Sequence, residues 1–553
     1  MKFTRRDLLV WGAGAAAGLM VTPVPWKLLD DTSIWSQNWP WIPQPARGPV
    51  EIKQSACTLC PNGCGVRVRM ASGWPVGVAG AASHPLTRGG LCPLAFAAHQ
   101  LNWHPDRLRT VRHRGAAASW DEARAAFVKA SGEGPVFVID GYPGRAASAV
   151  LESFAQKRGE YRVLRGAEAR ALVPYENWTG TPAAGLGYDL ENSQTIVSFG
   201  APLLDGWGIP GRFTRIWAER ASGMADPQLR LIQVDDSLSR TAARAWQWIA
   251  LRPGSEAALA AGIARVLVEE RLLVAHGPIP SVSLVDASQQ TGLELDAIRA
   301  LARNIIARTP AVAIARDNEP GIAALNALLG AVGASGGIVR RLKGAKSYEN
   351  ANDEIPSARA VLIDSSVPWN FAPQTDAEVF RFAAWDDGSS KADWLLPAPG
   401  FLEELTDIPT APTSGRETYA IATSLAKAAH KTENSAQFLA DIDPSLLTAE
   451  NIIHKRCADL FRSRAGSLHA QNVAPISGIA SAKELEEQLR NGAVWVNDPD
   501  TETLRCELKQ WPETETSTSR KWSASWLPCV MPALASKLYQ ESDLRELLQG
   551  RNA

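Results

Sequence analysis

CTLCPNGC, residues 57–64, holds three cysteines within eight residues, and a fourth follows in RGGLCP, residues 88–93. Pro61 and Gly63 let the backbone turn sharply enough for three sulfurs to converge. The four cysteines have the spacing C-x2-C-x3-C-x27-C and are Cys57, Cys60, Cys64 and Cys92. A [4Fe–4S] cluster needs one thiolate for each iron, so this spacing predicts a single cluster near the amino terminus.

Two other chemistries also use four cysteines. An all-thiolate zinc site usually comes as two C-x2-C pairs, which differs from three cysteines crowded into one loop. Disulfides are the second alternative, because the chain also carries an export signal. The other cysteines, Cys457, Cys506 and Cys529, are widely spaced and predict no second cluster.

The composition bounds the class of protein. A chain of 553 residues is too long for one ordinary core, so about two to four domains are expected. With 45% hydrophobic and 21% charged residues it has the balance of a soluble globular protein. The net charge of −1 gives no basic excess to neutralise phosphates, which argues against a nucleic-acid partner.

The first 30 residues predict a twin-arginine signal or anchor. Arg5 and Arg6 stand in TRRDLL, and a mildly apolar, small-residue run follows them. The twin-arginine route carries folded proteins, which suits a cluster inserted in the cytoplasm. Residues 31–48 are rich in Trp and Pro and are interpreted as an extended arm, with partner docking as a hypothesis.

The pattern along the rest of the chain predicts an α/β fold. The alternation in GVRVRM suggests a small β-rich cluster domain at residues 49–115. From about residue 116 the pattern changes to strand–helix alternation, and from about residue 440 onward it weakens.

Strand and helix signals support this division. Ser119, with Glu122 three residues on, predicts a capped helix start. Leu259, Ile263 and Val266 predict one buried helix face. Near-continuous apolar runs predict parallel strands buried on both faces at 136–140, 195–199, 229–234, 311–315 and 360–364.

Taken together, these features resemble the large subunit of the molybdopterin oxidoreductase superfamily. The resemblance covers about residues 50–440 and is closest to the branch of polysulfide reductase, alternative complex III and the periplasmic menaquinone reductase complex. Beside the cysteines, its carriers are SWDEA (119–123), YDLENSQTIVSFGAPLLDGWG (188–208), QVDDSLSRTA (233–242), LRPGSEAALA (251–260), LNALLGAVGASGGI (325–338) and ADWLLPAPGFLEE (392–404).

The resemblance implies two doubly wound α/β domains, the first formed by 116–165 plus 306–440 and the second by 166–305. It also implies an irregular region at 441–553, with the carboxy-terminal barrel reduced or absent. In that family the two α/β domains bind molybdopterin guanine dinucleotide beyond the carboxyl ends of the strands. The alternative is that the matching positions here are ordinary strand-end turns, and Glu256 stands where the family usually has Asp. By resemblance, one such site would be lined by Gly200, Ala201, Asp235, Ser239, Arg252, Gly254 and Glu256.

Three departures from the family pattern bear on the metal. The residues after Cys92 read Pro-Leu-Ala-Phe and lack the cation that bridges cluster and pterin. The region before the DLEN segment has no Cys or Ser to bind molybdenum, and only Glu176 and Thr181 offer oxygen there. The barrel that clamps both pterins is the third loss. Together they predict a subunit that keeps the fold and the cluster without a molybdenum site, and no catalytic residue is assigned.

Finer expectations concern the cluster surroundings. Gly63 and Gly65 are candidates for leaving N–H groups accessible to the sulfurs, with tight turns as the alternative. His84, eight residues before Cys92, is expected to pack nearby in a hydrogen-bonded structural role.

The resemblance implies an electron-transfer subunit of a quinone-linked respiratory complex on the periplasmic side of the cytoplasmic membrane. Its implied partners are a ferredoxin-like multi-cluster iron–sulfur subunit, a polytopic quinone-binding membrane subunit and, as a further candidate, a multihaem cytochrome c. Two alternatives stay open. One is an active molybdenum or tungsten enzyme acting on a sulfur or arsenic species, and the other is an assembly subunit with zinc or disulfides.

Overall fold

The computed structural model describes most of the chain: residues 4–21, 49–104, 107–223, 226–273, 278–351, 357–364, 375–385, 392–428, 430–498 and 504–513. The Trp-rich arm at 31–48 and Cys529 lie outside the described residues. The amino-terminal segment forms helix α1 (Arg5–Val21). Within the ranges given above, none of the helices has the length and apolar character needed to cross a membrane.

The cluster domain is a three-stranded antiparallel sheet with one helix. It consists of β1 (Val50–Ala56), β2 (Gly65–Ala71), β3 (Trp74–Gly80) and α3 (Pro93–Leu101). In β2, Val66 and Val68 are fully buried, whereas Arg67 and Arg69 are exposed, so the alternation seen in the sequence is the alternation of the two faces of the sheet. The small β-rich domain predicted from the sequence is confirmed.

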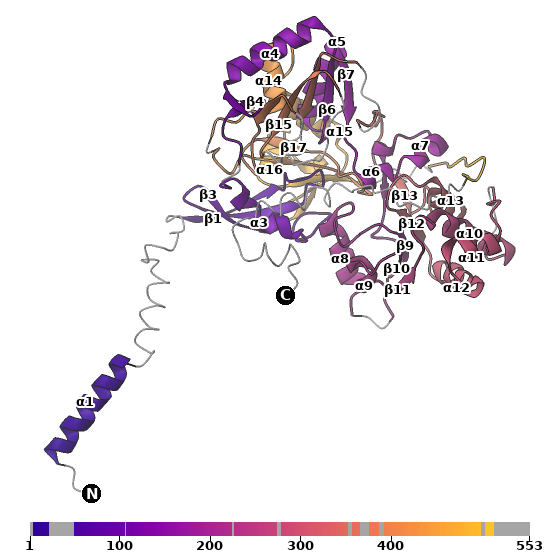
Figure 1. Ribbon diagram of the computed structural model, residues 1–553, viewed down its shortest axis with the longest axis horizontal. Helices are drawn as coiled ribbons and strands as arrows, with labels where there is room; N and C mark the ends of the chain where they lie inside the picture. The colour runs from indigo at the N-terminus through magenta and orange to yellow at the C-terminus, as the bar shows by residue number, and fades with distance from the viewer. Residues whose placement is uncertain are drawn as a thin grey trace.

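The first lobe is built on a seven-stranded sheet (Figure 1). From edge to edge its strands are β5 (Ala116–Ala118), β4 (Val111–His113), β16 (Trp394–Pro397), β15 (Glu378–Ala383), β14 (Ala360–Asp364), β6 (Val136–Asp140) and β7 (Gly159–Val163). The five strands from β16 to β7 pair in parallel. Buried side chains on both faces explain why these strands read as continuous apolar runs.

Different elements cover the two faces of this sheet. Val138 and Leu362 point into a core shared with α4 (Trp120–Glu133), α5 (Ala146–Arg158) and α14 (Ser435–Ile442). Phe137 and Val361 point the other way, into an apolar core that also contains three of the cluster cysteines. The iron-binding loop therefore shares the core of the first lobe.

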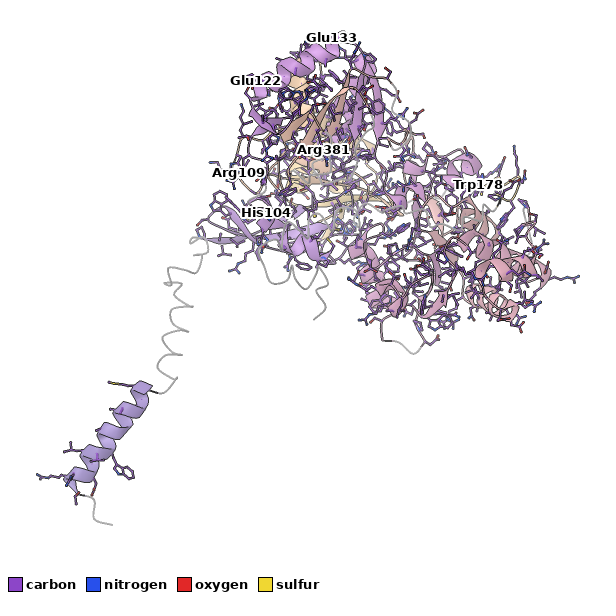
Figure 2. The ribbon with its side chains drawn as sticks, in the orientation of Figure 1. His104, Arg109, Glu122, Glu133, Trp178 and Arg381 are labelled. Carbon is purple, nitrogen blue, oxygen red and sulfur yellow. The ribbon has the colours of Figure 1, made fainter. Side chains whose placement is uncertain are left out.

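Helix α4 begins as the sequence predicts. The Ser119 hydroxyl accepts a hydrogen bond from the Glu122 backbone N–H, and the Glu122 carboxylate accepts one from the Ser119 N–H at 2.7 Å. This reciprocal arrangement is a capping box. Figure 2 shows Glu122 and Glu133 near the two ends of this helix at the surface of the first lobe.

The second lobe holds a parallel four-stranded sheet in the order β11 (Gln247–Ala250), β10 (Arg230–Asp235), β9 (Thr195–Phe199) and β12 (Ala311–Ala315). It is packed with α8 (Pro210–Arg220), α9 (Arg240–Arg244), α10 (Glu256–Glu269), α11 (Leu284–Thr291), α12 (Leu295–Ile306) and α13 (Pro320–Leu328). Between the lobes in sequence run α6 (Ala167–Arg170), α7 (Pro174–Thr179), η1 (Ala183–Gly185) and β8 (Leu186–Tyr188), which pairs with β13 (Ile338–Arg340).

The sequence-based domain boundary at residue 306 was wrong for this strand. Ala311 pairs with Thr195 across β12 and β9, so 311–315 belongs to the second lobe rather than the first. The strand signal itself was correct. Its partner could not be read from the sequence because several buried parallel strands have the same apolar pattern.

The prediction of an irregular carboxy-terminal region was also wrong for most of its described part. An antiparallel five-stranded sheet has the order β17 (Thr406–Ile408), β18 (Glu417–Ala422), β21 (Val494–Asn497), β19 (Ser467–His469) and β20 (Val473–Pro475). Helices α15 (Ala449–Ser463) and α16 (Ala482–Arg490) pack together beside it, with the short η2 (Ile476–Gly478) between strands. Strands of three or four residues are too short to show a period of two in the sequence.

Candidate iron–sulfur site and strand-end sites

The cysteine loop joins β1 to β2. The Cys57 N–H donates to the Cys64 carbonyl oxygen at 2.8 Å, which closes the loop on itself. Cys92 stands at the N-cap of α3, with φ −77° and ψ 156°. All four cysteines are free thiols, and the three in the loop are buried while Cys92 is partly exposed. A four-thiolate donor set free of disulfides is what a cubane cluster requires.

Two glycines shape this loop. Gly63 has φ +55°, and a Cβ there would lie 2.1 Å from Cγ2 of Ile408 on β17. At Gly65 a Cβ would lie 2.5 Å from the His84 side chain. Both positions exclude larger residues because the loop packs tightly against its surroundings.

Burial dominates the electrostatics of the thiols. It raises the pKa of Cys57 and Cys64 well above the ordinary value, and the neighbouring cysteine sulfurs raise it further. Burial first, and then Cys92, raises the pKa of Cys60 to about 12. Cys92 packs against the apolar core that contains the three loop cysteines, and it contributes to the raised pKa of each of them, so the fold brings it to the loop. Thiolates here need a cationic partner such as iron to be stable.

Backbone amides face three of the sulfurs. Hydrogen bonds from the N–H groups of Leu59 and Asn62 lower the pKa of Cys57 and Cys60 against the effect of burial. The N–H groups of Leu94 and Ala95, in the first turn of α3, do the same for Cys92. Amide donors of this kind tune cluster potentials. The amide donors are therefore those four residues. The glycines predicted as donors, Gly63 and Gly65, contribute to the packing of the loop instead.

Within the described residues, no three His, Cys, Asp or Glu side chains are grouped as ligands of a single metal ion. A cubane makes a different geometric demand, since each thiolate binds its own iron. The residues present fit a [4Fe–4S] cluster by the chemistry of their donor set: four free thiols, mostly buried, with amides directed at the sulfurs.

His84 packs beside the loop in a structural role, as the sequence suggests. Its Nδ1 accepts hydrogen bonds from the N–H of Thr87 at 3.2 Å and from the Thr87 hydroxyl at 3.1 Å. Burial lowers its pKa to about 4, with His469 as a smaller cause. The imidazole is therefore neutral at physiological pH, and its ring lies against Gly65.

The fold brings together three of the residues that the resemblance assigns to a dinucleotide. Gly200 follows β9 and donates its N–H to the Val234 carbonyl oxygen at 2.7 Å, one residue before Asp235. The Ala201 carbonyl oxygen accepts from the Ser198 hydroxyl at 2.9 Å. Gly200, Ala201 and Asp235 thus lie at the carboxyl edge of the second sheet, where parallel strands place their ligands.

An arginine of the chain itself occupies this edge. Arg316 follows β12, and its Nε donates to the Gly200 carbonyl oxygen at 2.6 Å. Its guanidinium lies 3.9 Å from the buried carboxylate of Asp235, which also accepts from Gln233 at 3.2 Å. A Cβ on Gly200 would approach the Arg316 guanidinium at 3.3 Å. These strand ends are joined by protein groups.

Of the other four assigned residues, Ser239 follows β10, and the remaining three follow β11. The Ser239 hydroxyl caps α9 by accepting from the Ala242 N–H at 3.1 Å. Arg252 donates to the Gln289 carbonyl oxygen at 2.6 Å. Gly254, with φ +78°, turns the chain into α10, whose first residue is Glu256. Ser239 and Arg252 therefore hold local structure, and the assignment of these residues to a dinucleotide stays a prediction.

Of the two side-chain oxygens considered for molybdenum, that of Glu176 has a structural partner. Glu176 Oε1 accepts from the Ala183 N–H at 2.5 Å. Thr181 is buried, and its N–H donates to the Thr179 hydroxyl at 3.2 Å. Both bonds shape the turn between α7 and η1. The Glu176 carboxylate is committed to this turn, and the loss of the molybdenum site stays a prediction.

Sequence reasoning missed a charged network at the carboxyl edge of the first sheet. Asp140 ends β6 and Asp364 ends β14, and the Arg145 guanidinium contacts both, lying 3.6 Å from Asp140. Glu404 is partly buried nearby and accepts from the Asn434 amide at 3.0 Å. Asp140 and Asp364 end apolar strands, which was a usable signal, whereas Glu404 comes from a distant loop without one.

Two small cavities adjoin this network. One is lined by Arg145, Asp364, Glu404 and Asp407, among others, and the second by Arg145, Glu404, Tyr142 and the cluster-loop residues Thr58 and Leu59. Each has a volume of about 20 Å³. That is room for about one water molecule, since a bound organic ligand needs about 300 Å³ or more.

Comparison with known proteins agrees with this description. Residues 50–101 match the family model of the molybdopterin oxidoreductase Fe4S4 domain. The chain is 29% identical over 479 residues to the menaquinone reductase, molybdopterin-binding-like subunit of Nitratidesulfovibrio vulgaris, covering 76% of this chain and 69% of that protein.

Two further similarities are more distant. The arsenate respiratory reductase molybdopterin-containing subunit of Shewanella sp. is 24% identical over 415 residues, and the chain spans 46% of its length. Among solved structures, acetylene hydratase from Pelobacter acetylenicus superposes with a TM-score of 0.58 at 13% identity. That match covers 88% of this chain and 79% of the other, and it shows a common fold.

Proposed function

Since this chain belongs to the molybdopterin oxidoreductase superfamily and is similar within it to the menaquinone reductase branch, we propose that it is an electron-transfer subunit without a functional molybdenum site. The [4Fe–4S] cluster would be held by Cys57, Cys60, Cys64 and Cys92. It would pass one electron at a time within a quinone-linked oxidoreductase complex. The observation that carries the proposal is the gathering of four free, mostly buried cysteines at one apolar core.

Chemistry at the cluster depends on the residues around it. When bound, the cluster supplies a one-electron redox couple. The apolar core that contains three of the cysteines keeps water from the sulfurs, and the amides of Leu59, Asn62 and Ala95 favour the more negative, reduced state. Cys92 is the ligand closest to solvent and so marks the side at which a redox partner approaches.

The two strand edges support the loss of the molybdenum site. Arg316 bridges toward Gly200 and Asp235 in the second sheet, and Arg145 bridges Asp140 and Asp364 in the first. Because an arginine of the chain itself stands at the carboxyl edge of each sheet, we infer that the fold serves as a scaffold rather than as a cofactor site. We assign it the docking of partners: a ferredoxin-like multi-cluster subunit, a quinone-binding membrane subunit and a multihaem cytochrome c.

The location is part of the same proposal. The pair Arg5–Arg6 at the start of α1 supports export by the twin-arginine route to the periplasmic side of the cytoplasmic membrane. Fusion of the first 48 residues to a reporter protein tests it. Export that is lost when both arginines become lysine supports this route.

Anaerobic purification of the full chain in its complex, with iron, zinc, molybdenum and tungsten quantified together, tests the function. We expect about four irons assignable to this chain and a reduced-state paramagnetic signal. Stoichiometric molybdenum or tungsten would restore the alternative of an active enzyme. Zinc or disulfides at the four cysteines would make it an assembly subunit.

A further inference from the structure

The cavity beside the cluster loop adjoins a buried polar group that has no hydrogen-bond partner among the described residues. Thr58 and Leu59, between the first two cluster cysteines, line it together with Tyr142, Arg145 and Glu404. The Tyr142 hydroxyl is buried and makes no hydrogen bond to any of the residues that the structure describes. A buried hydroxyl without a partner beside a cavity of about 20 Å³ is the setting of an ordered water molecule.

Glu404 connects this cavity to the second one. Both cavities are lined by Arg145, Glu404 and Thr406. The second cavity continues to Asp364, Asp407 and Asn434. A water in each would place Glu404 between the cluster loop and the charged network at the end of the first sheet.

The charges around Glu404 are unbalanced. Four carboxyl groups meet two guanidinium groups in this network: Asp140, Asp364, Asp407 and Glu404 against Arg145 and Arg456. Glu403, the next residue, is neutralised separately by Arg107. A buried excess of negative charge is relieved when one carboxyl group takes up a proton.

Glu404 is the carboxyl group best placed to take that proton. Asp364 pairs with Arg145, and Asp407 pairs with Arg456 and accepts from the Ala146 N–H at 2.7 Å. Glu404 accepts from the neutral amide of Asn434. Burial raises the pKa of Glu404 to about 6; Arg145 and Asn434 oppose the rise, whereas Asp364 and Glu403 add to it.

We propose that Glu404 is a proton-binding site coupled to the cluster, so that one-electron reduction of the cluster is accompanied by uptake of one proton at this carboxylate. The electron comes from a one-electron donor protein or, in a titration, from dithionite. The proton comes from solvent and forms an O–H bond on Glu404. The coupling is electrostatic, because the added negative charge disfavours a second anion nearby.

This inference rests on the proposed function and deepens it. The linkage is an equilibrium property, so it is measured by redox titration monitored by the paramagnetic signal. The sample is the full chain, isolated anaerobically with its cluster. Between about pH 5 and 8 we expect the potential to fall as pH rises. Where the potential changes most steeply with pH, the slope should approach about 59 mV per pH unit, which corresponds to a tenfold change in the oxidised-to-reduced ratio.

Matched variants identify the group. Glu404→Gln keeps the shape and the Asn434 contact but removes the titration, so its potential should not vary with pH across this range. Glu433→Gln is the control. Glu433 is also partly buried with a raised pKa, but it pairs with Arg124 and is not among the residues that line either cavity. Its potential should keep the dependence of the unmodified protein.

Infrared difference spectroscopy on the unmodified protein provides a readout that requires no variant. Reduction should produce the carbonyl band of a protonated carboxylic acid, shifted in D₂O. A potential independent of pH, a slope that survives in Glu404→Gln, or a spectrum without that band would overturn the inference. Absence of iron and of the paramagnetic signal would instead overturn the proposed function, so the two failures are distinguishable.

Discussion

The side chain of Arg316 donates from Nε to the carbonyl oxygen of Gly200 over 2.6 Å, joining the ends of β12 and β9. The guanidinium stands at the edge where parallel sheets place their ligands. Gly200, with φ +67°, forms the turn that exposes this carbonyl oxygen. A positive charge supplied by the chain thus stands at the carboxyl edge of the second sheet, bonded to the turn that follows β9.

Removal of that arginine should destabilise the second lobe. Arg316→Ala leaves the Gly200 carbonyl oxygen and the Asp235 carboxylate without this donor, and we expect a loss of about 1–3 kcal/mol in the free energy of unfolding. The measurement is anaerobic urea unfolding of the iron-loaded chain. Arg299→Ala, at a partly exposed position on α12, is the control and should change stability by about 0.5 kcal/mol or less. If both variants lowered the free energy of unfolding equally, the contacts of Arg316 with Gly200 and Asp235 would not stabilise the second lobe.

Cluster binding should depend on each loop cysteine. Cys60→Ser replaces a thiolate with a poor iron ligand, so we expect most of the iron and the paramagnetic signal to be lost. Cys506→Ser, a half-buried thiol far along the chain, should retain both. An iron content that is unchanged in Cys60→Ser would contradict the assignment of the site.

Gly63 should be required for space as well as for backbone conformation. Gly63→Ala brings a methyl group to within 2.1 Å of Ile408 Cγ2, so we expect reduced iron content and a lower melting temperature. Gly73→Ala is a matched control, since Gly73 also has positive φ, +80°, but nothing within 4 Å of a Cβ. It should show only the conformational cost of about 1 kcal/mol. Partial recovery of iron in the double variant Gly63→Ala with Ile408→Ala would separate the clash from the strain.

The ion pair between Arg107 and Glu403 should behave as a buried pair. Both side chains are 1% exposed, and the pair links the segment after α3 to the loop before β17. Glu403→Gln leaves an unpaired buried guanidinium and should cost about 3–5 kcal/mol.

Replacement of both partners, as Arg107→Met with Glu403→Leu, should cost less than Glu403→Gln alone, because no charge is then left buried. Denaturant unfolding of the two variants beside the unmodified chain measures the difference. If the double variant were less stable than Glu403→Gln, the ion pair would contribute more to the free energy of unfolding than the neutralisation of one buried charge.

The sequence was sufficient where a signal is local. The cysteine spacing, the Ser119–Glu122 capping box and the apolar strands at 136–140 and 195–199 depend on neighbouring residues, and the structure shows the predicted elements there. The roles assigned to the strand-end residues remain predictions. What the sequence lacked was long-range information.

Two features depended on contacts between distant segments. The pairing of Ala311 with Thr195 joins strands 116 residues apart in the sequence, and nothing local to either strand selects the partner. Glu404 and Arg145 meet beside the same cavities, although 259 residues separate them. Buried charged residues of this kind produce no periodic pattern in the sequence, because their pairing depends on groups that are distant along the chain.

Because Phe137 and Val361 share a core with three iron-binding cysteines, the cofactor and the sheet are parts of one cooperative unit. A polypeptide that has not received its iron would have a loosened interior under the whole of β6 and β14. The compactness of the chain would then report whether iron has been inserted. A transport pathway that accepts only compact proteins would therefore distinguish chains with iron from chains without it, although it makes no contact with the metal.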